Sequence, residues 1–296
     1  MSLVAWRDVL ACPVCHASLD ASATDALRCE RCDERYAVAN GVADLRTPDA
    51  RRAMDARSPG SDGWARWHEA IRGLESWRAT RARRSRGGPA VSDGADDLSA
   101  LEMLEHAGVR GVVVDVGAKR GERSRLLLPG TRYVGIDPFA RALDVQSAAT
   151  AQMACGLAED LPIADGAADT VMSLAAFDYF IDPSRAVDEM ARVLKPGGTL
   201  ALMVSVVAPS VARARGAPTR IGRARAALRS VLDVGLASGA GLALAGLRST
   251  ERAHTNYFTR DDVLGLVQRR FVVRWTHSVA QATSEIVYIA ATRTPG

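Results

Sequence analysis

The chain has 296 residues, which is enough for one large domain or for one domain and a small module. Its apolar fraction of 48% and charged fraction of 24% are ordinary for a soluble globular protein, and no internal repeat or low-complexity tract is evident. The net charge of +4 permits nucleic acid or anionic substrates without requiring them. The most apolar run, 231–247, carries Asp233 and several glycines and is short for a membrane span. We therefore expect a cytoplasmic protein without a transmembrane segment.

Two C-x-x-C pairs stand near the start of the chain, Cys12 with Cys15 and Cys29 with Cys32. Each pair can offer two thiolates to one ion, and two pairs complete a tetrahedral zinc site. Four thiolates leave no open coordination position, so this zinc would be structural and not catalytic. We expect residues 1–46 to be a self-contained zinc ribbon, because so short a module needs the folding energy of a metal. A redox dithiol and a chance pairing of cysteines are the alternatives.

Residues 47–95 are expected to be a linker with an amphipathic helix in its middle. Large apolar residues recur there at helical spacing, namely Trp64, Trp67, Ile71, Leu74 and Trp77. Such a stripe favours docking of the helix on the main domain, and lining of an acceptor pocket is the alternative. Arginines follow between 78 and 86, where a solvated basic face and an RNA contact both remain open.

The main domain is expected to begin at residue 96. An apolar run at 112–116 predicts a parallel strand that is buried on both faces. The glycine turn Asp115-x-Gly117-x-Lys119-x-Gly121 ends this strand, and a second strand at 133–136 ends in Asp137. Ligands of such sheets bind at the carboxyl ends of the strands. There Asp137 can accept both hydroxyls of a ribose, about twenty residues after the turn begins.

Capping residues indicate where helices begin and end. Asp96 or Asp97 can cap a helix that Gly108 ends, and Asp182 can cap a second helix with Pro183 at its first position. The segment Thr259–Asp262 can cap a third helix. Two strands at 271–279 and 284–292 are expected to follow it as an antiparallel pair.

The glycine turn resembles motif I of class I S-adenosylmethionine-dependent methyltransferases, usually D-x-G-x-G-x-G, with Lys119 at the middle glycine. Residues 156–180 resemble the run G-D-A-E-x-L-P-F-x-D of the same family, with Leu157 at its first acid. The most specific match is Ala191-Arg-Val-Leu-Lys-Pro-Gly-Gly198, a structural turn of ubiquinone/menaquinone-biosynthesis-like methyltransferase domains. The resemblance implies an α/β fold with a Rossmann-like, seven-stranded class I methyltransferase sheet over 96–296. The head is similar to zinc ribbons in front of some bacterial methyltransferases, including an rRNA guanine methyltransferase.

This resemblance implies that S-adenosylmethionine is the cofactor. The residues expected to contact it are Asp115, Gly117, Lys119, Gly121, Asp137, Pro138, Leu157, Ala158, Glu159 and Ser173. In the family, the acid at the position of Leu157 meets the adenine amino group, so here the backbone around Ala158 is expected to address the adenine edge. Two interpretations of Lys119 stay open: its ammonium pairs with the cofactor carboxylate, or it is a solvated lysine on a tolerant loop.

Methyl transfer from a sulfonium is an in-line displacement, so the protein mainly aligns the donor with the acceptor. A base is needed only if the acceptor must lose a proton. The candidates are Asp178 and Tyr179 at the end of the fourth strand, and His254 and Tyr257 before the last helix. A packing role is the alternative for Tyr179, and loop bracing is the alternative for His254.

Residues 208–250 are expected to be an insertion after a strand at 199–207. Arginines accumulate in its first half. In the family such material often covers the acceptor; the alternatives are a homodimer surface, a contact with anionic lipid and a solvated helical hairpin.

The sequence thus predicts a methyltransferase that acts on oxygen or nitrogen of a small molecule or of a glycan or natural-product precursor. The pieces 133–138, 156–159, 177–179 and 257–259 are similar to methyltransferases encoded with surface-polysaccharide and natural-product pathways. A second hypothesis is an rRNA or tRNA base methyltransferase whose arginines grip phosphates. A third is a non-catalytic binding protein, which Lys119 and Leu157 motivate.

Overall fold

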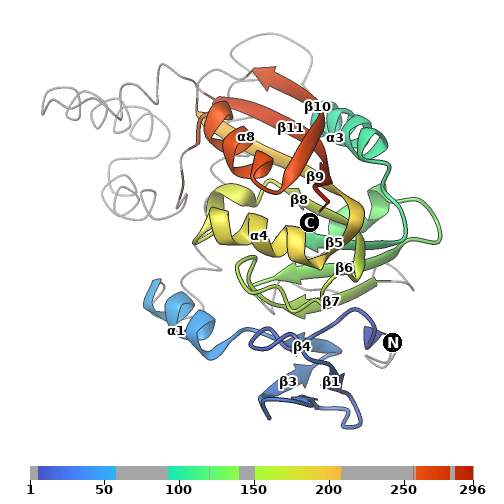
Figure 1. Cartoon of the computed structure of the whole chain (residues 1–296), viewed down its shortest axis with the longest axis vertical. Helices are drawn as coiled ribbons and strands as arrows, with labels where there is room; N and C mark the ends of the chain where they lie inside the picture. The colour runs from blue at the N-terminus through green and yellow to red at the C-terminus, as the bar shows by residue number, and fades with distance from the viewer. Residues whose placement is uncertain are drawn as a thin grey trace, which may run out of the picture. The chain divides into compact units, whose positions relative to one another are not determined.

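The computed structural model describes residues 6–57, 93–119, 121–139, 151–207, 256, 258–280 and 284–295 (Figure 1). The predicted helix at 64–77 and the insertion at 208–250 lie outside these residues. The chain divides into two units: the first contains Met1–Thr47, Ser99–Val207 and Asn256–Gly296, and the second contains Pro48–Leu98 and Ala208–Thr255. In the second unit, the structure describes α1 (Pro48–Arg57) and the beginning of α3 (Asp93–Ala107).

Among the described residues of the first unit, eleven strands form one sheet in the order β1-β2-β3-β4-β7-β6-β5-β8-β9-β11-β10. The head supplies β1 (Leu19–Asp20), β2 (Ala26–Cys29), β3 (Arg35–Ala39) and β4 (Val42–Asp44). The main domain supplies β5 (Val112–Val116), β6 (Arg132–Asp137), β7 (Ala151–Cys155), β8 (Ala168–Leu174), β9 (Leu194–Val207), β10 (Phe271–Ala280) and β11 (Ser284–Arg293). Strands β5 to β9 are mutually parallel, and β11 is antiparallel to both β9 and β10. The predicted seven-stranded α/β sheet is therefore confirmed.

Helices cover both faces of the domain sheet. All five residues of β5 are buried, as expected for a central parallel strand. Val112, Val114 and Val116 pack in the core that includes α4 (Pro183–Val193) and α8 (Arg260–Gln268), which lie side by side in Figure 1. Val113 points to the opposite core, which includes α3. Two short 3-10 helices, η2 (Glu122–Leu126) and η4 (Phe177–Tyr179), follow the carboxyl ends of β5 and β8.

The head is joined to the domain sheet through its last strand. Strand β4 runs parallel to β7, with Asp44 opposite Cys155, and the Leu45 N–H donates to the Cys155 carbonyl at 2.9 Å. Most buried hydrophobic residues of the head belong to the same core cluster as those under α4, while Val42 belongs to the cluster on the opposite face. The head therefore extends the domain sheet, while the module boundaries at 46 and 95 remain predictions.

The predicted caps of two helices are confirmed. The Asp182 carboxylate accepts the Arg185 N–H at 3.1 Å, with Pro183 as the first residue of α4. Thr259 and Asp262 form a reciprocal capping box at the start of α8. Helix α3 ends before Gly108 as expected but starts at Asp93, earlier than the predicted cap. Among the described residues, no helix is both long and apolar enough to cross a membrane.

Strand β9 begins at Leu194 instead of the predicted Thr199. Leu194 already pairs with Ala168, and the register then shifts before Thr170 pairs with Thr199. The Lys195–Gly198 turn is therefore an irregularity inside the strand and not a loop in front of it.

Candidate functional site

The glycine turn closes the carboxyl end of β5 against that of β6. Gly117 has a φ of 83°, and a Cβ at this position would lie 2.2 Å from the Ala176 Cβ, so glycine is required here. The N–H groups of Gly117 and Ala118 both donate to the Ile136 carbonyl, at 2.8 and 3.1 Å. These bonds place the turn directly beside Asp137, as the sequence predicts for a ligand-binding edge.

Asp137 is a buried carboxylate held by backbone donors. Its Oδ2 accepts the Lys119 N–H at 2.9 Å, and its Oδ1 accepts the Phe139 N–H at 3.0 Å, across Pro138. Burial raises the pKa of Asp137 to about 6, although these two hydrogen bonds and the Lys119 charge act in the opposite direction. A carboxylate has about four lone-pair positions, so two acceptor positions remain for a ligand.

Asp115 is a second buried carboxylate in the same region. The Tyr133 hydroxyl donates to Asp115 Oδ2 at 2.6 Å. Burial raises the pKa of Asp115 to about 6, and the Tyr133 hydrogen bond lowers it. Sequence reasoning missed the role of Tyr133. Gly135 lies opposite Asp115, and the two-residue period of a strand puts Tyr133 on the same face as Gly135. That period is the signal that could have indicated a contact between Tyr133 and Asp115.

Lys119 occupies the left-handed region of backbone space, with a φ of 52°. That conformation suits the glycine found in the family motif and costs a lysine roughly 1–2 kcal/mol. The Lys119 side chain is exposed. The backbone at Lys119 therefore keeps the path of a glycine turn, and its N–H serves Asp137. Pairing of its ammonium with the cofactor carboxylate remains a prediction, as does the alternative of a solvated lysine.

Residues 157–159 are packed against the end of β7. Leu157 and Ala158 are buried, and the Leu157 carbonyl accepts the Asp160 N–H at 3.3 Å. The Glu159 carboxylate accepts the N–H groups of Ile181 at 2.6 Å and Asp182 at 3.1 Å. Glu159 therefore supports the turn that leads into α4, and its assignment to the cofactor remains a prediction.

The remaining candidates lie at the end of β8 or beyond the described residues. The buried Ser173 hydroxyl has no hydrogen-bond partner in the part of the chain that the structure describes. Asp178 and Tyr179 lie in η4, where Asp178 is buried and its carbonyl accepts the Asn256 N–H at 3.1 Å. The Asn256 side chain also donates to the Phe180 carbonyl at 2.6 Å, a contact that sequence reasoning missed. The residues that the structure describes do not include Arg120, His254 or Tyr257.

Gly121 completes the turn, with a φ of 71° and its N–H donated to the Ala118 carbonyl at 2.8 Å. The three positions Gly117, Lys119 and Gly121 thus all have positive φ. At Gly117 and Gly121 the space that a side chain would take is occupied by Ala176 and by Met153, so glycine lets the turn pack closely against the domain. The turn lies at the carboxyl ends of β5 and β6, the edge at which ligands of parallel sheets bind.

The four head cysteines converge on one point. Their sulfur atoms all lie within 4.8 Å of one another, and three of the separations are 3.4, 3.6 and 3.6 Å. A tetrahedral zinc with bonds of about 2.3 Å needs sulfur atoms about 3.8 Å apart. His16 and Asp33, which follow the second cysteine of each pair, have nearly equal φ values of 59° and 58°. The two pairs therefore form similar knuckles, as a single shared metal requires.

Residues 114–202 match a protein family described as a methyltransferase domain. The matched segment contains the end of β5, the glycine turn, Asp137 and the run that ends at Gly198. Residues 114–202 are a methyltransferase domain. The resemblance to class I S-adenosylmethionine-dependent methyltransferases, recognised from these motifs, is thereby confirmed.

Curated relatives are similar to about a third of the chain. An uncharacterised methyltransferase of Mycobacterium tuberculosis is 40% identical over 107 residues, which cover 35% of this chain and 43% of the relative. A malonyl-(acyl-carrier protein) O-methyltransferase of Coxiella burnetii is 35% identical over 97 residues, which cover 33% of this chain and 34% of the relative. The chain thus spans less than half the length of these relatives.

Among solved structures, the cyclase SpnF has a TM-score of 0.50 and 15% identity, and the match covers 68% of this chain and 82% of SpnF. A likeness at this identity shows the fold alone. The methyltransferase domain of this chain therefore shares its architecture with a protein that is named for a different reaction, so the reaction and its substrate must be argued from the site.

Proposed function

We propose that this chain transfers a methyl group from S-adenosylmethionine, which binds at the carboxyl ends of β5 and β6. The observation that carries this proposal is the Asp137 carboxylate, which two backbone N–H groups hold beside a turn of positive φ. Its two remaining acceptor positions match the two hydroxyls of a ribose in number and chemistry. Backbone around Ala158 is assigned to the adenine edge, and Lys119 lies on the side of the turn assigned to the amino-acid portion.

The cofactor supplies an activated methyl group on a positively charged sulfur, so the chain's own task is to bind and align. Burial of Asp115 and Asp137 gives this edge of the sheet two carboxylates in a region of low dielectric constant. Above their pKa values these groups favour a cationic ligand over a neutral one. Asp178 and Tyr179 in η4 are the proposed residues near the methyl acceptor, with His254 as a further candidate base.

We also propose a structural zinc in the head, bound by Cys12, Cys15, Cys29 and Cys32. The sulfur separations and the matching knuckle conformations support this ion. The Cys29 sulfur accepts the N–H groups of Arg31 and Cys32, each at 3.4 Å, which would lower the charge on a bound thiolate. Four sulfur ligands would close the coordination sphere, so the zinc takes no part in methyl transfer.

The proposed acceptor is a small molecule or a glycan or natural-product precursor that is methylated on oxygen or nitrogen. The Coxiella relative is named for O-methylation of a malonyl group on a carrier protein, which supports an acyl or small-molecule acceptor over a nucleic acid. No described feature of the site favours RNA, so a base methyltransferase is the second candidate only through the arginines at 78–86 and 213–229.

Calorimetry with S-adenosylhomocysteine tests the cofactor site on the full chain. Wild-type protein should bind this product, and Asp137→Ala should weaken binding by on the order of 2–3 kcal/mol, because a pair of charge-assisted hydrogen bonds is lost. Asp261→Ala is the matched control, since Asp261 is an exposed aspartate in the first turn of α8. Unchanged affinity in Asp137→Ala would reject the ribose assignment. Absence of binding in the wild type would reject the enzyme and favour a non-catalytic binding protein.

A further inference from the structure

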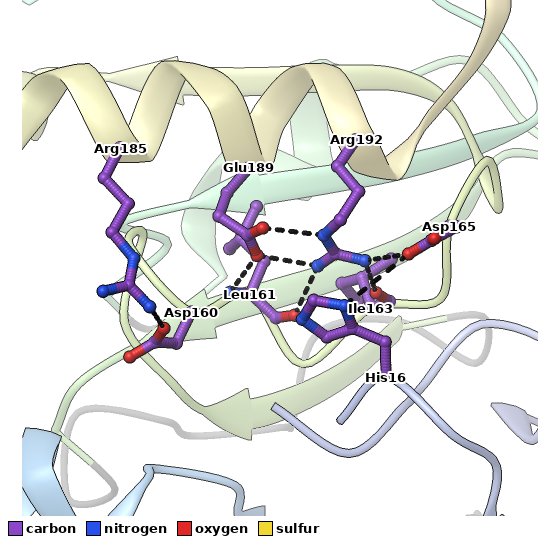
Figure 2. A network of polar contacts seen from close by, with 8 residues as sticks. All are labelled: His16, Asp160, Leu161, Ile163, Asp165, Arg185, Glu189 and Arg192. Carbon is purple, nitrogen blue, oxygen red and sulfur yellow. Dashed lines mark hydrogen bonds and ion pairs between the residues drawn. The ribbon is translucent and has the colours of Figure 1, made fainter. Parts of the chain in front are cut away.

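The segment 160–165, which follows the backbone assigned to adenine, is held from two sides (Figure 2). One side is helix α4 of the methyltransferase domain, and the other side is the first knuckle of the head. The segment lies between β7 and β8 and belongs to neither strand, so these contacts are additional to the pairing of the sheet strands.

On the side of α4, Glu189 and Arg192 act as a clamp. The Leu161 N–H donates to Glu189 Oε2 at 2.9 Å, and Arg192 Nη2 donates to the Leu161 carbonyl at 2.9 Å. Arg192 Nη1 also donates to the Ile163 carbonyl at 2.8 Å. Arg192 and Glu189 form an ion pair at 2.7 Å, and their side chains are only 17% and 13% exposed, respectively. Both backbone polar groups of Leu161 are therefore satisfied by one buried ion pair.

On the side of the head, the contacts are made by the backbone. The Ala11 N–H donates to the Pro162 carbonyl at 3.0 Å, and the Ala164 N–H donates to the Val9 carbonyl at 2.9 Å. Together they form an antiparallel bridge in which Leu10 lies opposite Ile163. The segment thus receives hydrogen bonds from α4 and from the head at alternating residues.

A side-chain contact links the two sides. Asp165 accepts a hydrogen bond from Arg192 Nη1 at 2.5 Å, and His16 Nδ1 lies 3.9 Å from the same carboxylate oxygen (Figure 2). His16 directly follows Cys15, and its φ of 59° belongs to the knuckle conformation. Its position therefore depends on the geometry of the Cys12–Cys15 pair.

The contacts from the head begin next to the proposed zinc ligands. Ala11 precedes Cys12, and the Cys12 N–H and carbonyl are both used within the knuckle, by Ala17 at 2.9 Å and His16 at 2.8 Å. A ribbon of this size takes its folding free energy from its metal. Loss of the metal would consequently loosen the knuckle next to Val9 and Ala11, the partners of Ala164 and Pro162.

We propose that the zinc-loaded head positions the segment 160–165, so that zinc and S-adenosylmethionine bind cooperatively to this chain. The proposal rests on the proposed function and adds a role for the head. With zinc bound, residues 9–16 hold 162–165 from the side opposite to α4. In zinc-free protein, residues 162–165 become ordered only when the cofactor binds. The entropy lost in that ordering lowers the affinity for the cofactor. Coupling of two binding sites is reciprocal, so the cofactor must raise zinc affinity by the same factor.

The test measures S-adenosylhomocysteine binding to the full chain, loaded with zinc and after removal of zinc by a chelator. We expect dissociation constants that differ by about tenfold, within the usual range for coupled sites. Zinc affinity, measured with and without S-adenosylhomocysteine, should change by the same factor. Equal dissociation constants in the two metal states would overturn the proposal. Failure of both states to bind would instead count against the proposed function.

Hydrogen exchange separates local loosening from general unfolding. On zinc removal, the Ala164 amide should exchange faster, because it loses the Val9 carbonyl, whereas amides in the β10–β11 ladder should keep their protection. This readout needs neither cofactor nor activity. If Ala164 exchanges at the same rate in zinc-free and zinc-loaded protein, the proposal is overturned, even where metal analysis shows zinc in the loaded head.

Two variants, each measured with and without zinc, test the side-chain link from His16 through Asp165 to Arg192. Asp165→Ala removes the partner of His16 and one partner of Arg192, and its carboxylate is 70% exposed, so the fold should persist. We expect a smaller effect of zinc on cofactor affinity. Asp188→Ala, which removes an α4 contact with Arg270 at 2.7 Å away from the segment, is the control and should keep the full effect. An equal zinc effect in both variants would overturn the role of the Asp165 contact.

Discussion

At the scale of single residues, the candidate site is defined by two buried aspartates whose hydrogen-bond partners among the described residues are a tyrosine hydroxyl and backbone N–H groups. Tyr133 donates to Asp115, and backbone N–H groups donate to Asp137. Burial of a carboxylate favours its protonated form, which is why the pKa values of both groups lie at about 6. Two such carboxylates lower the stability of the free protein and favour a cationic ligand. Function and stability are therefore opposed at these positions.

Asp115→Asn should stabilise the ligand-free protein near neutral pH. The pKa of Asp115 is raised from 3.8 to about 6, so the folded state binds more protons than the unfolded state between about pH 4 and pH 6. Wild-type stability therefore falls as pH rises through this window, by up to about 3 kcal/mol. Asparagine does not ionise and can still accept the Tyr133 hydroxyl. Urea unfolding should show the gain at pH 8 and its disappearance below pH 4, and Asp261→Asn should show neither.

Lys119→Gly should stabilise the fold by about 0.5–1 kcal/mol, because glycine adopts a positive φ without the cost paid by lysine but loses more entropy on folding. The Lys119 charge also lowers the pKa of Asp137, so the variant should raise that pKa in an NMR titration. Lys119→Arg keeps both the charge and the strain and should change neither quantity. A glycine variant no more stable than the wild type would contradict the assigned backbone conformation. If the ammonium pairs with the cofactor carboxylate, the glycine variant should bind the cofactor more weakly, most clearly at low salt. Unchanged or tighter binding would reject that pairing.

The residues of the site differ in how far sequence could reveal them. Gly117, Asp137 and the cysteines are recognisable because each has a chemical requirement that acts locally: a positive φ, a strand end or a ligand spacing. Tyr133 and Asn256 act through partners 18 and 78 residues away, on Asp115 and Asp178. Nothing in their immediate neighbourhood in the chain indicates those partners, so only the packed sheet shows them.

At the scale of elements, helix α4 has a second task beyond covering the sheet. Arg192→Met should lower the free energy of unfolding by roughly 3 kcal/mol, because a buried ion pair loses one partner and Glu189 is left uncompensated. Arg185→Met on the same helix removes an ion pair with Asp160 whose arginine is 61% exposed, and it should cost less than about 1 kcal/mol. Urea unfolding of both variants provides the comparison. Equal costs would show that the clamp on 161–163 contributes nothing beyond a surface pair.

The head should carry about one zinc per chain, which metal analysis of purified protein can measure. Cys29→Ser should remove most of it, because a hydroxyl replaces one of four thiolates. Cys155→Ala is the matched control: Cys155 is the fifth cysteine, buried in β7 and outside the cluster, and its loss should leave the zinc content unchanged. A wild-type head that is folded and metal-free would contradict the zinc assignment.

The boundaries of elements were predictable where caps mark them, as at Asp182 and Thr259. The start of α3 and of β9 was not. Asp93 and Asp96 are both of a cap-forming type, so residue type alone does not choose between them, and the pairing of Leu194 with Ala168 sets the start of β9. The partnership of β4 with β7 was not predictable either. Strand pairing depends on edges that the whole fold exposes, and β4 and β7 are more than one hundred residues apart, so local periodicity carries no information about it.

At the scale of the whole molecule, the first unit contains the methyltransferase domain segment 114–202, and the head that carries the four clustered cysteines continues its sheet. The seven domain strands place Asp115 and Asp137 at the carboxyl ends of β5 and β6, and the head contributes β4 beside β7, the strand that leads into the segment proposed to address adenine. The same order of strands thus connects the proposed metal site with the proposed cofactor site. Motifs alone predict both sites, but only the sheet order shows that one continuous sheet carries Cys29 on β2 and Asp137 on β6.

The most direct test of the central claim is an experimental structure of the full chain with S-adenosylhomocysteine. It should show both ribose hydroxyls within hydrogen-bond distance of the Asp137 carboxylate, at about 2.5–3.0 Å. The backbone of the glycine turn should lie along the amino-acid portion, and the backbone at Ala158 should face the adenine edge. A ligand bound away from the carboxyl ends of β5 and β6, with Asp137 still bonded only to the Lys119 and Phe139 N–H groups, would contradict the claim.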